Sequence, residues 1–110
     1  MNDNDLQKLD KANKAIKSNP KDADAYVDRA DVYACNGNNT QAIADFNMAI
    51  SIGFSSNNAL GSAYIGLGYI YKDMGDLEKA IEYISKAVAL VPGQWDFVLQ
   101  QVMPGGFYNR

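Results

Sequence analysis

The 110-residue sequence contains no histidine and only one cysteine, Cys35. No Cys–His pair, no histidine-dependent metal site and no internal disulfide can form from such a composition. The motifs of common catalytic sites are absent too: there is no Gly-x-Ser-x-Gly, no Cys-x-x-Cys and no glycine-rich phosphate loop. We therefore expect no enzymatic activity, no metal and no cofactor, and we interpret Cys35 as an inert free thiol.

Long apolar runs and an excess of positive charge are also missing. The first residues lack the apolar segment of a signal peptide, and nowhere do 18 apolar residues follow one another, so we expect a cytoplasmic protein. Lys and Arg number 10 against 13 Asp and Glu, which gives a formal net charge of −3. Nucleic acids and anionic membranes are therefore disfavoured as partners, because binding to phosphates requires the opposite sign.

Proline and glycine are few, with three and nine residues, and 47% of the residues are hydrophobic against 21% charged. These proportions are ordinary for a globular protein. A chain of this length buries enough surface to fold without disulfides or metals. We expect a single domain over residues 1–110.

The sequence contains a duplicated unit. Val27 and Val32 correspond in character to Ile65 and Ile70, 38 residues further on. Six identical residues keep the same offset, for example 64 − 26 = 38 and 87 − 49 = 38: Tyr26, Tyr33, Gly37, Ala42, Ile43 and Ala49 recur as Tyr64, Tyr71, Gly75, Ala80, Ile81 and Ala87. Chance does not preserve one offset across six positions, so the architecture is repetitive.

Each copy has apolar residues at helical spacing on both sides of a short polar break, which predicts two antiparallel helices joined by a turn. Gly37 and Gly75 stand where a helix ends in a left-handed residue, and Asn39 or Asp76 can cap the following helix. Small residues are expected where the two helices cross, because bulky ones would separate the backbones. These are Ala30 and Ala42 in the first copy and Gly68 and Ala80 in the second.

Together these positions resemble the tetratricopeptide repeat. The residues that carry the resemblance are Tyr26, Ala30, Tyr33, Gly37, Ala42, Phe46 and Ala49 in the first copy, and Tyr64, Leu67, Gly68, Tyr71, Gly75, Ala80, Ala87 and Pro92 in the second. The resemblance implies an all-α solenoid of antiparallel helical hairpins with about six helices. It also implies a protein–protein interaction module whose first helices line a concave groove.

The expected organisation comprises a half repeat at 5–19, repeats at 23–56 and 61–94, a capping helix at 95–102 and a tail at 103–110. The offset of 38 exceeds the family's 34 by about one helical turn. We therefore expect the first helix of the second repeat to begin early, near Asn58. Arg29 also departs from the pattern, since Leu67 occupies its position in the second copy. Its stem can cover apolar surface while the guanidinium reaches solvent or a carboxylate.

Asp24, Asp28 and Asp31 lie at i, i+4 and i+7 on one face of the first helix of repeat one. Like charges at this spacing repel mildly, so they either form a solvated face or serve a basic ligand. The resemblance implies groove-facing positions at Asp24, Val27, Asp28, Asp31, Ile65, Tyr69, Lys72 and Asp73. A partner segment with lysine or arginine beside a bulky apolar residue would complement them. Val27 and Asp31 stand where family members that clamp a carboxylate carry Lys and Asn, which argues against that clamp.

The C-terminal segment is more apolar than the outer cap of a solenoid needs. The residues concerned are Trp95, Phe97, Val98, Val102, Phe107 and Tyr108. They either cover the last repeat of a monomer or form a self-association surface. Two functions thus stay open: an adaptor that binds a peptide or protein segment in the groove, and a structural subunit that assembles as a homo-oligomer through its C-terminal residues.

Overall fold

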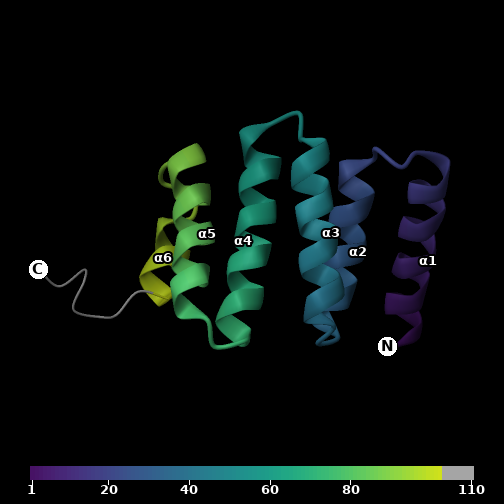
Figure 1. Cartoon of the computed structure of the whole chain (residues 1–110), viewed down its shortest axis with the longest axis horizontal. Helices are drawn as coiled ribbons and strands as arrows, with labels where there is room; N and C mark the ends of the chain where they lie inside the picture. The colour runs from purple at the N-terminus through teal and green to yellow at the C-terminus, as the bar shows by residue number, and fades with distance from the viewer. Residues whose placement is uncertain (103–110) are drawn as a thin grey trace, which may run out of the picture. The chain divides into compact units, whose positions relative to one another are not determined.

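The computed structural model describes residues 1–102, which form six α-helices and no strand (Figure 1). This confirms the predicted all-α fold of helical hairpins. The helices are α1 (Asp3–Ser18), α2 (Ala23–Cys35), α3 (Asn39–Ile52), α4 (Asn57–Asp73), α5 (Leu77–Leu90) and α6 (Asp96–Val102). They belong to two compact units, of which the first is Met1–Phe54 and the second begins at Ser55. The expected tail at 103–110 lies outside the described residues.

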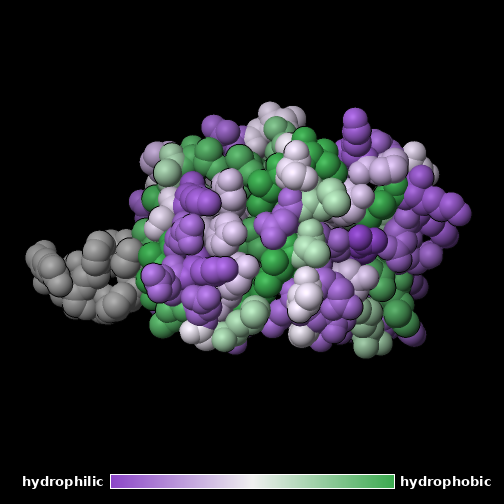
Figure 2. All heavy atoms as spheres, viewed as in Figure 1, coloured by the Kyte–Doolittle hydropathy of each residue, from purple (hydrophilic) through white to green (hydrophobic). Residues whose placement is uncertain are grey.

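In the first unit, α2 and α3 form a helical hairpin and α1 packs against α2. Ala30 and Ala42 are completely buried in this hairpin, as expected of small residues at a helix crossing, and Phe46 is almost completely buried as well. The α1 helix begins at the Asn2 cap, whose side chain accepts a hydrogen bond from the Asp5 backbone N–H at 2.8 Å. On the face shown in Figure 2, hydrophilic side chains predominate over α1.

The second unit repeats the hairpin with α4 and α5. The α4 helix begins at Asn57, within one residue of the expected start, after the side chain of Ser56 caps it. A Cβ atom on Gly68 would lie 2.5 Å from Cγ1 of Ile84, so only glycine allows this approach of α5. The short α6 then covers the hairpin, and its Val98 is almost fully buried.

The turns inside the two hairpins are alike, with one correction to the sequence interpretation. Gly37 and Gly75 have φ angles of 77° and 85°, which confirms the predicted left-handed residues. Asp76 caps α5 by accepting a hydrogen bond from the Lys79 backbone N–H. The prediction for Asn39 is wrong, because Asn39 is already helical and the cap residue is Asn38, whose side chain makes no capping hydrogen bond. In both copies the cap residue directly follows the glycine.

Arg29 links all three helices of the first unit. Its Nε and Nη2 atoms each donate a hydrogen bond of 2.8 Å to the carboxylate of Asp45 on α3. Its Nη1 donates to the side-chain oxygen of Asn13 on α1 at 3.0 Å. The sequence allowed the guanidinium to reach either solvent or a carboxylate, and the structure shows that it binds a carboxylate. Asp45 is only 6% exposed, so this bidentate pair supplies the partner that a buried charge needs.

Candidate functional site

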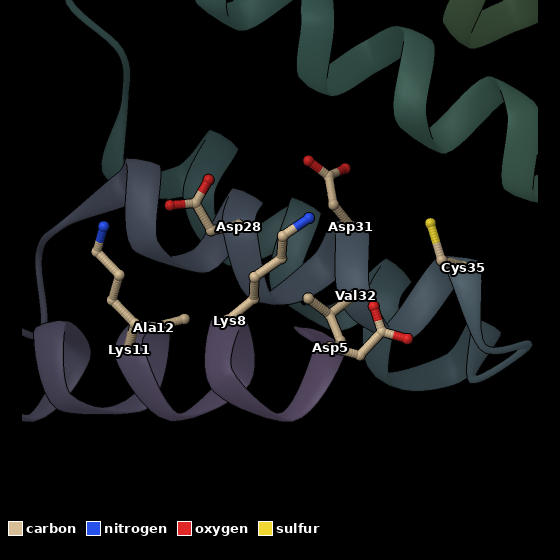
Figure 3. A pocket seen from close by; sticks show the side chains of 8 residues that line it. All are labelled: Asp5, Lys8, Lys11, Ala12, Asp28, Asp31, Val32 and Cys35. Atoms are coloured by element: carbon tan, nitrogen blue, oxygen red, sulfur yellow. The ribbon is translucent and has the colours of Figure 1, made fainter. Parts of the chain in front are cut away.

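A hollow of about 310 Å³ lies between α1 and α2 in the first unit (Figure 3). The two helices contribute equally to it. Its lining consists of Asp5, Lys8, Lys11 and Ala12 from α1 and of Asp28, Asp31, Val32 and Cys35 from α2. The lining residues recur every three or four positions along each helix, so each set occupies a single helix face.

The lining is apolar between the helices and charged where the side chains reach outward. Ala12 and Val32 are buried at the contact of α1 with α2. Figure 3 shows Lys8 rising from α1, with Asp28 and Asp31 projecting from α2. A ligand in the hollow would therefore meet both an apolar surface and charged groups of either sign.

Both carboxylates that α2 places in the hollow have a raised pKa. Partial desolvation of the carboxyl raises the pKa of Asp28 above its ordinary value, although the residue is exposed overall, and the negative charge of Asp24 raises this pKa further, while Lys11 opposes both effects. Burial likewise raises the pKa of Asp31, the charge of Asp28 adds to this, and Lys8 opposes it. A bound cation would stabilise the charged form of both carboxylates and so lower both pKa values.

Ion pairs within residues 1–102 do not involve these two carboxylates. Lys14 pairs with Asp10 on the exposed side of α1 at 2.9 Å, and Arg29 pairs with Asp45. The third carboxylate of the hollow, Asp5, accepts a hydrogen bond of 3.2 Å from the amide of Asn36. Asp28 and Asp31 thus remain available to a ligand.

The other groove positions predicted in the first unit lie outside this hollow. Asp24 is exposed near the start of α2. Val27 is partly buried and packs against the cluster formed by Ala23, Tyr26 and Ala49. Two of the four predicted residues of α2, Asp28 and Asp31, therefore line the hollow, and the other two do not.

In the second unit, the predicted groove residues differ in exposure. Tyr69 is 38% exposed, and Lys72 and Asp73 are exposed near the end of α4. Ile65 is buried in the cluster that contains Trp95, so it does not face a ligand as the sequence interpretation had it. The physical reason is that Ile65 packs in one cluster with Trp95 and with Val98 and Val102 of α6.

The sequence model of the tetratricopeptide repeat family matches residues 21–92, which include both helical hairpins with their glycine turns. The chain belongs to the tetratricopeptide repeat family. Tetratricopeptide repeats generally mediate protein–protein interactions and are typically non-enzymatic. No curated protein matches the chain. The matched range contains Asp28 and Asp31, whereas Lys8 and Lys11 precede it.

The capping helix of this tetratricopeptide repeat chain turns most of its apolar residues inward. Trp95, Val98 and Val102 are buried within the second unit, so they are not free to contact a second copy. Phe97 is 58% exposed. Phe107 and Tyr108, the remaining candidates for self-association, lie outside the described residues.

Sequence reasoning missed the α1 side of the hollow in this repeat protein. Lys8 and Lys11 are three residues apart and therefore share a helix face, but the sequence does not say which face α1 turns towards α2. The buried Ala12, one residue after Lys11, is the available signal, since a small residue marks close helix contact. Within residues 1–102, no helix has the length and apolar character needed to cross a membrane.

Proposed function

We propose that this chain is a non-enzymatic adaptor that binds a basic and apolar segment of a partner protein. The first unit would contribute the acidic face of α2, with Asp24, Asp28 and Asp31. The second unit carries its own exposed candidate residues for a separate contact, Tyr69, Lys72 and Asp73 near the end of α4. The observation that carries the proposal is the pair Asp28 and Asp31, which project beside an apolar surface without forming an ion pair.

Electrostatic complementarity selects the chemistry of the segment. Lysine or arginine would neutralise the carboxylates of α2, and a neighbouring bulky apolar residue would lie against the apolar surface between α1 and α2. The net charge of −3 favours the approach of a basic segment as well. The proposal places the module in the cytoplasm, where a single free thiol such as Cys35 stays reduced.

A peptide-display selection with the full chain as bait tests this function. We expect the selected peptides to combine lysine or arginine with bulky apolar residues, and a bait with Asp28→Lys and Asp31→Lys to lose them. A bait with Glu78→Lys and Glu82→Lys, two exposed residues of α5, carries the same change of net charge and should retain them. Failure to select any peptide, or equal loss in both variants, would contradict the proposal.

The exposed ring of Phe97 favours a second candidate function, a structural subunit that self-associates through α6. Sedimentation analysis at several protein concentrations separates the two functions. We expect the mass of the 12.0-kDa monomer, because the other apolar residues of α6 already pack inside the chain. A larger mass that returns to the monomer value in Phe97→Ser would establish the structural subunit instead.

A further inference from the structure

We propose that the hollow between α1 and α2 is a pocket for one lysine or arginine side chain of the bound segment. The aliphatic stem would lie against Ala12 and Val32, and the cationic head would lie between Asp28 and Asp31. This inference rests on the proposed adaptor function and specifies where the basic residue of the partner binds. It also makes α1, which precedes the region matched by the family, a wall of the site.

The lining matches the two-part chemistry of such a side chain. Lysine and arginine combine an apolar stem with a charged end, and they are most stable where the stem is covered and the end meets an opposite charge. The hollow offers this sequence of surfaces, with buried Ala12 and Val32 between the helices and two carboxylates projecting from α2. An acidic ligand would be attracted by Lys8 and Lys11 but would meet three carboxylates, those of Asp5, Asp28 and Asp31, so the lining favours a cation by one charge.

Lys8 and Lys11 place two positive charges in the pocket, which oppose the binding of a cation. Each lies close enough to lower the pKa of a carboxylate of α2, Lys8 for Asp31 and Lys11 for Asp28, yet neither forms an ion pair with it. An incoming cation would be repelled by these ammonium groups and attracted by the carboxylates. The two lysines should therefore weaken the binding that the two aspartates provide.

The walls of the pocket are held in place before a ligand arrives. Asn13 of α1 accepts a hydrogen bond from Arg29 of α2, and Asp5 of α1 accepts one from Asn36 at the end of α2. These hydrogen bonds join α1 to α2 and its cap at two separate points. A prearranged site loses less entropy on binding, so a single side chain can be recognised there.

The test uses the full chain and the peptide acetyl-Ser-Leu-Lys-Leu-Ser-amide, with affinity measured by calorimetry. Matched peptides replace the lysine with arginine, norleucine or Nε-acetyl-lysine. We expect the lysine and arginine peptides to bind, and the two uncharged ones to bind about tenfold more weakly or worse, as expected for loss of a hydrogen bond to a charged group. Backbone amide signals of Ala12 and Val32 should shift on addition of the lysine peptide in NMR spectra.

Variants of the two walls should act in opposite directions. Asp28→Asn with Asp31→Asn should lower the affinity for the lysine peptide about tenfold. Lys8→Ala with Lys11→Ala should instead raise this affinity about threefold. The control Glu78→Gln with Glu82→Gln changes the net charge as the aspartate variant does, but on α5, and should leave the affinity unchanged. The NMR spectrum of each variant establishes that its fold is retained.

The outcomes separate the pocket from the general function. Equal affinity for the lysine and norleucine peptides, or an unchanged affinity in the aspartate variant, overturns the pocket even if display-selected peptides still bind the chain. No binding of the lysine peptide at millimolar concentration overturns it as well. The adaptor function falls separately, if the display selection yields no peptide that depends on α2.

Discussion

Arg29 and Asp45 show how one residue pair changes the interior of a repeated hairpin. The second unit has Leu67 and Tyr83 at the corresponding positions, since 29 + 38 = 67 and 45 + 38 = 83. Leu67 is completely buried there, and the Tyr83 ring stacks on Tyr71 at 5.6 Å between centroids. The same backbone crossing is thus stabilised by a bidentate ion pair in one unit and by apolar and aromatic packing in the other.

Replacing this pair one residue at a time should give unequal losses of stability. Arg29→Leu leaves the Asp45 side chain, which is 8% exposed, without a cation and should cost about 3 kcal/mol. Asp45→Tyr leaves Arg29, whose side chain is 24% exposed and can reach water, and should cost about 1 kcal/mol. The double variant copies the second unit and should lie near the wild type in urea denaturation. Additive losses would show that the pair does not act as a unit.

Asp28 should lower the stability of the free protein at neutral pH. Burial and the charges of Asp24 and Asp22 raise its pKa in the folded state, against the opposing effect of Lys11. The folded chain therefore holds this proton more tightly than the unfolded chain, so the stability contributed by this group increases as the pH falls through the raised pKa. Asp28→Asn should add about 0.3 kcal/mol at pH 7, the size of a like-charge repulsion on a helix.

Thermal unfolding of both proteins between pH 7 and pH 3.5 checks this sign. The advantage of Asp28→Asn should shrink as the wild-type carboxyl becomes protonated, because both side chains are then neutral. Asp10→Asn serves as the control, since Asp10 pairs with Lys14 on the exposed side of α1 and its loss should bring no gain. A gain that grows towards acid pH would contradict the explanation.

At the scale of elements, α6 depends on a glycine that the repeat pattern does not explain. Gly61 lies in the first turns of α4 and is buried. A Cβ atom on Gly61 would lie 2.3 Å from Cζ3 and 2.6 Å from Cη2 of Trp95, far inside van der Waals contact. The tryptophan ring therefore packs directly on the backbone of α4, and this contact helps to fix the capping helix.

Gly61→Ala should displace the Trp95 ring and loosen α6. The overpacking should lower the free energy of unfolding by about 1–3 kcal/mol, which is more than the higher helix propensity of alanine adds. Trp95 is the only tryptophan in the chain, so its fluorescence reports the change directly and should move to longer wavelength as water reaches the ring. The control Ser62→Ala, at an exposed neighbouring position, should leave the emission unchanged. Unchanged emission in Gly61→Ala would mean that the ring is not held by this contact.

At the scale of the whole molecule, an acidic chain with an acidic face on α2 should bind basic segments in a salt-dependent way. The formal charge is −3, and salt screens exposed charges over distances of about 10 Å at 0.1 M. Raising the salt concentration from about 50 to 300 mM should lower the affinity for the lysine peptide about threefold to tenfold. The norleucine peptide should lose far less in the same calorimetric titrations. Equal salt dependence of the two would show that the charge of the lysine side chain does not provide the attraction.

Local patterns in the sequence were sufficient to predict the helices of this protein. Helix periodicity, small residues at the crossings and glycines at the turns act within a few neighbouring residues, so the hairpins, the early start of α4 near Asn58 and the family could be derived without coordinates. The cap of α3 was misplaced at Asn39 instead of Asn38, because a run of three possible capping residues follows Cys35 closely and the pattern does not choose among them.

Contacts between helices were decided by the tertiary structure alone. Successive residues of a helix point about 100° apart, so a small rotation of a helix changes which residues meet its neighbour. That rotation brings Lys8 and Lys11 opposite Asp28 and Asp31, and it lets α6 cover Ile65. The helices and the charges they carry follow from local sequence, because they depend on near neighbours. Only packing between residues distant in the chain determined which charges share a hollow and which apolar residues are covered.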